Sequence, residues 1–211
     1  MTDPAPDNRR PLASRQSAWA AGLARLAVQR GITPNQVSQT SVGFAALGFT
    51  LYALSSIGPG PIQLLLLVLA AATIQARLIC NLIDGMVAVE GGQGAKDGPF
   101  WNEAPDRASD FLLLLGAGVA AGSPTLGAIA ATLAIAAAYI RELGRAEGFP
   151  SDFSGPMAKP HRMAALTIGT VIAAFYATDW TLNLTLWVIL AGTAATILRR
   201  ATRLISAMKA R

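Results

Sequence analysis

The chain has 211 residues, of which 53% are hydrophobic and only 14% are charged. A soluble domain carries about 25% charged residues, so this composition argues against a soluble globular protein. The net charge of +5 would suit a nucleic-acid partner, but the placement of the basic residues gives another reason for it. The single cysteine, Cys80, excludes a disulfide framework and a cysteine-rich metal site.

The N-terminal segment, residues 1–38, is polar, and we expect it to lie in the cytoplasm. Within it, residues 14–30 (SRQSAWAAGLARLAVQR) combine apolar positions with arginines. This pattern predicts an amphipathic helix on the inner leaflet, with the arginines facing anionic head groups. The alternative is a partly ordered tail.

Six apolar stretches follow, and they predict an all-α integral membrane protein with six transmembrane helices. The expected spans are residues 40–57, 61–83, 109–122, 125–144, 162–178 and 183–200. Short turns at 55–61, 122–124 and 178–183 join the spans into three hairpins. The predicted organisation is thus a membrane domain over residues 39–200 and a basic cytoplasmic tail over residues 201–211.

The seventeen lysines and arginines lie on one side of this predicted bundle, and none falls in the three hairpin turns. The positive-inside rule therefore places both termini in the cytoplasm, with the bundle in a membrane of the bacterial inner-membrane type. The same rule explains the net positive charge of the chain, so a nucleic-acid partner is not needed to account for it.

Residues 84–110 (DGMVAVEGGQGAKDGPFWNEAPDRASD) form a polar stretch between two apolar ones. It carries six of the twelve carboxylates, which are Asp84, Glu90, Asp97, Glu103, Asp106 and Asp110. If the second span continues as a helix, Asn81 and Asp84 share one face; Asp106 and Asp110 likewise share a face at the start of the third span. Antiparallel neighbouring helices would bring these four side chains together at the cytoplasmic boundary.

Carboxylates that lie close together repel one another, and divalent cations such as Mg²⁺, Mn²⁺ and Ca²⁺, which take oxygen ligands, remove that cost. A metal-linked phosphate reaction is therefore a natural use of the cluster, since ionisable residues at membrane depth usually serve function. In the alternative, the acids pair with Arg77, Arg107 or Lys96, or cap the third helix. A small cation transporter fits less well, because the acids lie at one face on two helix ends.

These residues resemble a known family, the CDP-alcohol phosphotransferases, whose motif is Asp-x2-Asp-Gly-x2-Ala-Arg-x8-Gly-x3-Asp-x3-Asp. Asp84-Gly85-x2-Ala88 matches its second aspartate, glycine and alanine, and Asp106-x3-Asp110 matches its closing pair. Three further segments resemble family segments before the first span and around the fourth and fifth spans; they are residues 31–38 (GITPNQVS), 139–148 (YIRELGRAEG) and 155–163 (GPMAKPHRM). The resemblance covers nearly the whole chain.

The chain departs from the motif at several positions. Asn81 stands in place of the first aspartate, and Val89 stands in place of the arginine. Residues 85–105 number twenty-one where the family has seventeen, so the motif glycine corresponds to Gly98 counted forward or to Asn102 counted back.

The resemblance implies a site. In the family, four acids hold a pair of divalent ions, Mg²⁺ or Mn²⁺, which bind the diphosphate of a CDP-linked substrate, and the last aspartate activates the acceptor hydroxyl. By position, the metal ligands here are Asn81, Asp84, Asp106 and Asp110, and the catalytic residues are Asp106 and Asp110. The CDP-binding positions are Asn81, Asp84, Gly85 and Ala88. The two small residues also suit close helix packing.

Asn81 offers a neutral oxygen and one negative charge fewer than aspartate. Glu90 or Glu103 would restore that charge, and the alternative is that both are solvated loop residues. A second group of residues, Arg141, Arg145, Lys159 and Arg162, lies on the same side as the acids. These four are expected to form a pocket for an acceptor that carries its own phosphate, since arginine suits bidentate phosphate contacts. The alternative is ordinary positive-inside anchoring. His161 either contacts the same phosphate or is a solvated loop residue.

The resemblance thus implies a homodimeric membrane enzyme of phospholipid biosynthesis. It would transfer a phosphatidyl group from a CDP-linked lipid such as CDP-diacylglycerol to an alcohol acceptor, releasing CMP. The alternative, which Asn81 and Val89 favour, is a degenerate relative that acts as a binding or scaffold membrane protein. Retention of the other three acids favours the enzyme.

Overall fold

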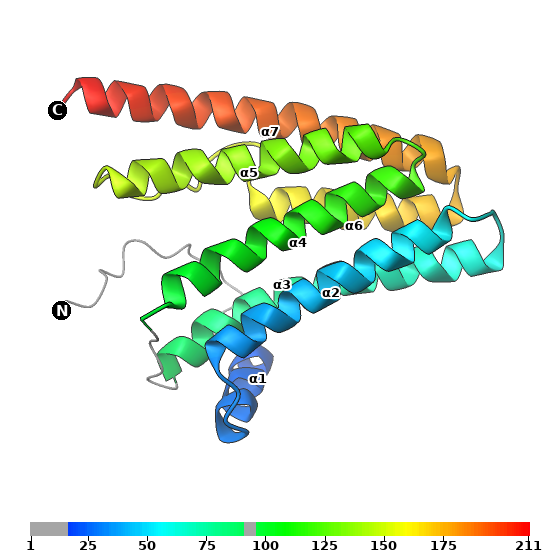
Figure 1. The fold of residues 1–211 in the computed structure, drawn as a ribbon, viewed down its shortest axis with the longest axis horizontal. Helices are drawn as coiled ribbons and strands as arrows, with labels where there is room; N and C mark the ends of the chain where they lie inside the picture. Colours follow the sequence, from blue (N-terminus) through cyan, green and yellow to red (C-terminus); the bar gives the residue numbers. More distant parts are fainter. Residues whose placement is uncertain (1–16, 91–95) are drawn as a thin grey trace.

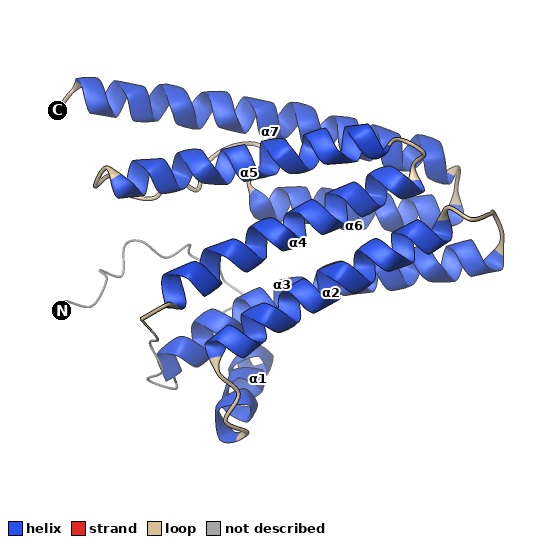
Figure 2. Cartoon of the chain, in the orientation of Figure 1, coloured by secondary structure: helices blue, strands red, loops and turns tan. Residues whose placement is uncertain are grey.

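The computed structural model describes residues 17–90 and 96–211, and in these ranges it contains seven α-helices and no strand. The helices are α1 (Ala18–Gln29), α2 (Pro34–Ser55), α3 (Pro61–Glu90), α4 (Gly98–Ala120), α5 (Pro124–Ala146), α6 (Lys159–Phe175) and α7 (Thr178–Lys209). Figure 1 shows α2 to α7 running along one long axis, with α1 across one end. The connections are short, as Figure 2 shows. The prediction of an all-α fold is confirmed.

Proline and a capping box fix where several helices begin. α2, α3 and α5 each start at a proline, which lacks the amide hydrogen that a first helical turn leaves unsatisfied. At α2 the Thr33 hydroxyl accepts from the Gln36 amide at 3.2 Å, and the Gln36 side chain accepts from the Thr33 amide at 2.9 Å. The GITPNQVS segment therefore sets the start of α2.

The helices α2 to α7 form three antiparallel hairpins with their turns at one end of the bundle, opposite α1 and the C-terminus (Figure 1). Glycine closes two of these turns. Gly60 has φ 133° and Gly122 has φ 66°, a region that residues with a β-carbon rarely adopt.

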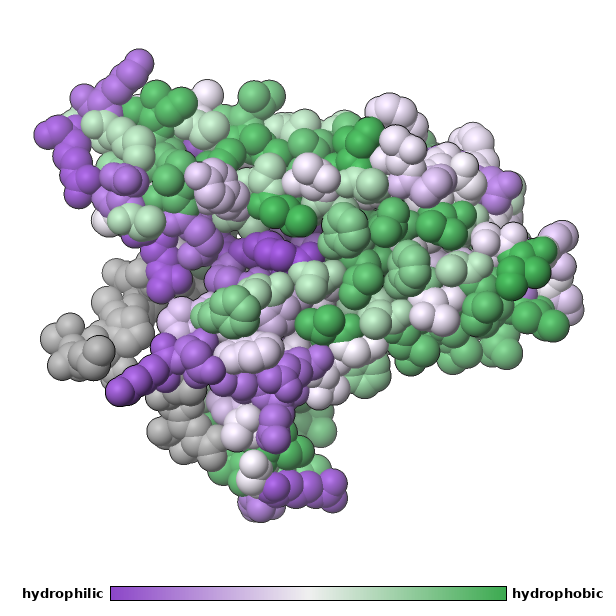
Figure 3. Space-filling model, in the orientation of Figure 1, coloured by the Kyte–Doolittle hydropathy of each residue, from purple (hydrophilic) through white to green (hydrophobic). Residues whose placement is uncertain are grey.

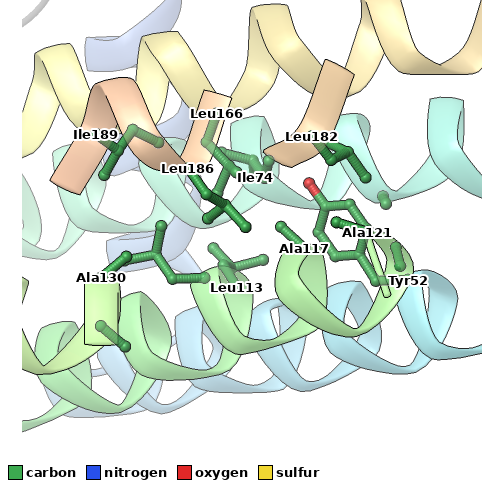
Figure 4. Close-up of a cluster of buried hydrophobic side chains, with 14 of the residues drawn as sticks. Tyr52, Ile74, Leu113, Ala117, Ala121, Ala130, Leu166, Leu182, Leu186 and Ile189 are labelled. Atoms are coloured by element: carbon green, nitrogen blue, oxygen red, sulfur yellow. The ribbon is translucent and has the colours of Figure 1, made fainter. Parts of the chain in front are cut away.

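One apolar core joins the six long helices. Figure 4 shows Tyr52 of α2, Ile74 of α3, Leu113 of α4, Leu166 of α6 and Leu186 of α7 pointing into the same cluster. Ala130 adds the contribution of α5. The phenol oxygen of Tyr52 also contacts the Thr170 hydroxyl on α6, which ties the first hairpin to the third.

α1 packs on the end of α3 through small residues. Ala20, Ala24 and Ala27 recur at helical spacing, are buried, and belong to one apolar cluster with Met86 and Val87. On another face, Trp19, Leu23 and Leu26 are exposed. A helix therefore occupies most of the predicted range. Its amphipathic, interfacial character stays a prediction, and residues 14–16 lie outside the described ranges.

Four helices are long and apolar enough to cross a membrane: Pro34–Ser55, Pro61–Val89, Pro124–Ala146 and Thr178–Lys209. α4 carries its charged residues in its first half, and α6 has only 17 residues. The prediction of six spans is therefore met in part, as four apolar spans and two helices that lie beside them.

Three helix ends differ from the expected bounds. α3 continues to Glu90, α4 begins at Gly98 rather than near residue 109, and α7 runs to Lys209 through most of the predicted tail. The expected bounds follow the apolar runs. A helix can extend beyond an apolar run into polar residues, provided that these residues tolerate helical geometry. Asp106 and Asp110 consequently lie inside α4, well after its first turn.

Hydrophilic residues gather at one end of the molecule. Figure 3 shows them at the end that carries the C-terminus and the start of α4, while hydrophobic residues cover most of the remaining face. The ends of α3, α5 and α7 and the starts of α2 and α4 lie at this end (Figure 1). The candidate site is built from these helix ends.

Candidate active site

Arg77 of α3 joins the two aspartates of α4. Its Nη2 donates to Asp110 Oδ1 at 2.8 Å and to Asp106 Oδ1 at 3.2 Å, and it lies 3.4 Å from the Asp106 carbonyl oxygen. The Arg77 side chain is 0% exposed. Of the pairing partners considered from the sequence, Arg77 is thus the one that the structure places on these acids.

Three more side chains complete the surroundings of the two aspartates. The Asn81 amide nitrogen donates to Asp106 Oδ1, and the Lys159 ammonium pairs with Asp106 Oδ2. Arg162 of α6 pairs with Asp110 Oδ2. Every carboxylate oxygen of Asp106 and Asp110 therefore contacts at least one donor.

Asp84 lies on the same helix as Asn81 but makes different contacts. Its Oδ2 accepts from the Ser38 hydroxyl of α2 at 2.8 Å, and its Oδ1 accepts from the Gly85 amide at 2.6 Å. The side chain is buried. Asn81 therefore contacts an α4 aspartate directly, whereas Asp84 makes its hydrogen bonds to α2 and to its own helix.

The donor chemistry of these residues suits a hard divalent ion, which takes carboxylate and amide oxygens. In residues 17–90 and 96–211, however, no three Asp, Glu, His or Cys side chains are grouped closely enough to hold one ion. Binding at Asp84, Asp106 and Asp110 therefore requires the α4 carboxylates to exchange some of their basic partners for the metal.

Glu103 is paired with arginines. Its two oxygens accept from Arg141 at 2.8 and 2.7 Å, and it also pairs with Arg107 one turn along α4. In this structure the negative charge of Glu103 therefore balances two arginines, and it does not replace the carboxylate that the motif has at position 81. The side chain of Glu90 lies outside the described part of the chain.

A basic pocket opens beside Asp110. Its basic lining residues come from four helices: Arg107 of α4, Arg141 of α5, Lys159 and Arg162 of α6, and Arg200 of α7. Arg145, the fourth residue of the predicted acceptor set, is not among the lining residues. It pairs instead with Glu142, and its side chain is 44% exposed against 14% for Arg141.

Arg200 is a pocket residue that the sequence analysis assigned only to the basic C-terminal region. Its Nε donates to the Ser154 carbonyl at 2.9 Å and its Nη1 to the Ala137 carbonyl at 2.8 Å. It is buried on α7. Its place as the last residue of the predicted span 183–200 was the available signal.

The loop between α5 and α6 is held against α7. The Thr196 hydroxyl accepts from the Met157 amide at 3.0 Å, and Arg203 donates to the Ser154 hydroxyl at 2.8 Å. Partial burial opposes ionisation of Asp152, but hydrogen bonds from Ser154 and the nearby arginines outweigh it and lower the pKa of this carboxyl. The loop thus places the start of α6, and with it Lys159, at the pocket.

The remaining predicted residues lie nearby. Gly85 and Ala88 are half-buried on α3, and His161 is exposed at the start of α6, outside the pocket lining. The exposed position of His161 agrees with the reading of it as a solvated residue.

We compared the chain with family models, characterised proteins and solved structures. No family model matches the chain. The chain is 27% identical over 190 residues to the phosphatidylinositol phosphate synthase of Mycolicibacterium smegmatis (strain ATCC 700084 / mc(2)155), covering 84% of this chain and 80% of that protein. This likeness to a phosphatidylinositol phosphate synthase supports the resemblance to the CDP-alcohol phosphotransferases that Asp84-Gly85-x2-Ala88 and Asp106-x3-Asp110 indicate.

Solved structures share the fold of this chain. The phosphatidylinositol phosphate synthase of Mycobacterium tuberculosis in complex with manganese and citrate superposes with a TM-score of 0.73 at 20% identity, covering 88% of each chain. The same protein with CDP-DAG bound gives a TM-score of 0.74 at 20% identity, covering 89% of this chain and 94% of that one. At this identity the likeness is one of fold.

Proposed function

We propose that this chain is a CDP-alcohol phosphotransferase that transfers a phosphatidyl group from a CDP-linked lipid, such as CDP-diacylglycerol, to an alcohol acceptor and releases CMP. The observation that carries the proposal is that the last motif aspartate, Asp110, forms part of the wall of a pocket lined by basic side chains. The relative in M. smegmatis is a phosphatidylinositol phosphate synthase, and its M. tuberculosis counterpart has been crystallised with manganese and with CDP-DAG.

The metal would be held by the carboxylates of Asp84, Asp106 and Asp110 with the oxygen of Asn81. A bound divalent ion, Mg²⁺ or Mn²⁺, neutralises the diphosphate charge and so stabilises the departure of CMP. Gly85 and Ala88, on the helix face beyond Asp84, leave room for the cytidine nucleotide. These assignments rest on the family motif and on the placement of the residues on α3 and α4.

Asp110 would take the proton of the acceptor hydroxyl, with Asp106 beside it. In this structure Arg162 holds Asp110 Oδ2 and also lines the pocket. A phosphate bound in the pocket competes with Asp110 for the Arg162 guanidinium. Acceptor binding therefore frees a carboxylate oxygen at the place where a base is needed.

The acceptor is proposed to carry a phosphate of its own. Arg141, Lys159 and Arg162 were predicted for this role, and Arg107 and Arg200 line the same pocket. Guanidinium groups converging from several helices suit a phosphate dianion. Arg145 is proposed only as an anchoring residue, because its side chain is exposed and pairs with Glu142.

The membrane arrangement is part of the proposal. α2 to α7 would form six spans, with α4 and α6 shielded by the four more apolar helices, and both termini and the site would face the cytoplasm. Residues 1–38, 39–200 and 201–211 remain the proposed divisions of the chain. A homodimer is proposed from the family resemblance alone.

The test is an acceptor panel. Purified protein with CDP-diacylglycerol and Mn²⁺ or Mg²⁺ should release CMP with an alcohol that carries a phosphate, such as inositol phosphate or glycerol phosphate, and much less with the free alcohols. Equal release with both kinds of acceptor would exclude the phosphate pocket. Binding of CDP-diacylglycerol with no CMP release from any acceptor would instead favour the degenerate binding protein.

A further inference from the structure

Arg77 is a buried cation in the middle of the candidate metal site. It lies on α3 one helical turn before Asn81, and its side chain is 0% exposed. It pairs with Asp110 at 2.8 Å and with Asp106 at 3.2 Å. A guanidinium that is out of contact with water is retained only where opposite charges surround it.

The pairing leaves part of the guanidinium unused. Only Nη2 of Arg77 makes these contacts; Nε and Nη1 are buried and have no hydrogen-bond partner. Buried donors without an acceptor are uncommon in proteins and are often satisfied by a ligand or a water molecule. Nη2 of Arg77 thus contacts the aspartates, while its Nε and Nη1 can donate to an oxygen of a bound anion.

The net charge of the motif residues predicts how many divalent ions the site needs. A motif with four aspartates carries four negative charges, which two divalent ions balance. Here Asn81 removes one negative charge, and Arg77 adds one positive charge in direct contact with Asp106 and Asp110. Two negative charges remain on Asp84, Asp106 and Asp110 together, and one divalent ion balances them.

Lys159 and Arg162 do not enter this count. Both also pair with the α4 aspartates, but both line the basic pocket, where an acceptor phosphate would compete for them. Arg77 is not among the pocket-lining residues and comes from the helix that carries Asn81 and Asp84. It is thus the cation that stays with the acids when the acceptor binds.

We infer that Arg77 takes the place of one of two ions, so that the chain binds a single divalent ion with Asp84, Asp106 and Asp110 while Arg77 supplies the other positive charge. The inference rests on the proposed function, because it assumes that the motif acids bind metal. It joins the departure at Asn81 and the buried cation Arg77 into one compensated change of charge.

The experiment counts ions without using turnover. The full-length protein in detergent, stripped of metal with a chelator, is titrated with Mn²⁺ in the presence of CDP, and free Mn²⁺ is followed by electron paramagnetic resonance. One ion per chain is the expected result. Two ions, or none, would overturn the inference.

Variants test the compensation itself. The double variant Arg77→Met/Asn81→Asp restores the four-aspartate motif and should bind two ions per chain. Arg145→Met, which removes an exposed arginine outside the pocket, should still bind one. A correctly folded double variant that still binds one ion would also overturn the inference; the count in the unaltered protein decides the matter if the double variant does not fold.

CMP release is measured on the same samples, so that the two proposals fail separately. Two ions together with CMP release would reject the role of Arg77 and leave the transferase standing. One ion with no CMP release from any acceptor would reject the transferase, while the charge count would stand.

Discussion

Asp110 illustrates at the residue scale how one carboxylate is held by groups from two other helices. Arg77 of α3 donates to one of its oxygens, and Arg162 of α6 pairs with the other. These contacts fix the orientation of the carboxylate. The residue is therefore positioned by two cations, one of which can be displaced.

Replacing Asp110 with asparagine should lower CMP release by a factor of about 10² or more, because the site then lacks the base for the acceptor hydroxyl. Asp152→Asn, which alters a more exposed loop carboxylate near the same end, should leave the rate close to that of the unaltered protein. Both rates are measured at saturating CDP-lipid. A rate for Asp110→Asn within a few-fold of the unaltered protein would exclude it as the base.

Arg141 and Arg145 form a matched pair on α5, one helical turn apart, and only Arg141 lines the pocket. Arg141→Ala should raise the acceptor KM about tenfold or more with a smaller change in the KM for the CDP-lipid, since a charge-assisted hydrogen bond contributes about 1.5–3 kcal/mol. Arg145→Ala should leave both constants nearly unchanged. Steady-state kinetics with each substrate varied in turn provides the measurement, and equal effects of the two variants would contradict the pocket.

At the element scale, the crossing of α4 and α5 depends on two glycines. A β-carbon on Gly127 would lie 2.6 Å from the Leu114 carbonyl oxygen and 2.9 Å from the Gly118 α-carbon. Small residues of this kind let helix backbones approach closely where lipid gives no hydrophobic drive for helix association.

Gly127→Val should therefore destabilise the protein by about 1–3 kcal/mol, as overpacking commonly does. Gly43→Val is the control, because a β-carbon on Gly43 of α2 would meet no atom within 4 Å. The thermal unfolding midpoint in detergent is the readout. An unchanged midpoint for Gly127→Val would show that the two helices do not meet closely at this point.

The sequence predicted the long helices and the first two hairpin turns well, because apolar runs and turns with Gly and Pro are local signals. Residues 178–183, expected to form the third turn, lie inside α7 instead. The sequence placed the start of α4 too late, since residues 98–108 are polar although they are helical. It offered Arg77 only as one of three possible partners for the acids, and it did not predict that Arg200 lines the pocket. Only tertiary packing decides which carboxylate or carbonyl group such a basic residue will meet.

At the scale of the whole molecule, charge divides the bundle into two ends. The basic pocket, the motif acids and the C-terminus lie at one end, and the three hairpin turns lie at the other (Figure 1). Figure 3 shows the same division as hydrophilic and hydrophobic regions of the surface. A lipid substrate would thus meet apolar helices along its tails and charged groups at its head group.

This division predicts the orientation of the chain. In a Cys80→Ser background, Asp179→Cys at the start of α7 and Met208→Cys near its end should react with a membrane-impermeant maleimide from opposite sides. In sealed inside-out vesicles, only the cysteine at position 208 should be labelled, because the proposed orientation puts this end of α7 in the cytoplasm. Labelling of both positions from one side would contradict a membrane-spanning α7.

Product analysis tests the central claim most directly. The purified protein is incubated with CDP-diacylglycerol, Mn²⁺ and a panel of phosphorylated alcohols, and the lipids are then identified by mass spectrometry. The account predicts a new phospholipid whose mass equals diacylglycerol phosphate joined to one acceptor, formed in equal amount with CMP and absent for Asp110→Asn. No new lipid from any acceptor, in protein that binds CDP-diacylglycerol, would contradict it.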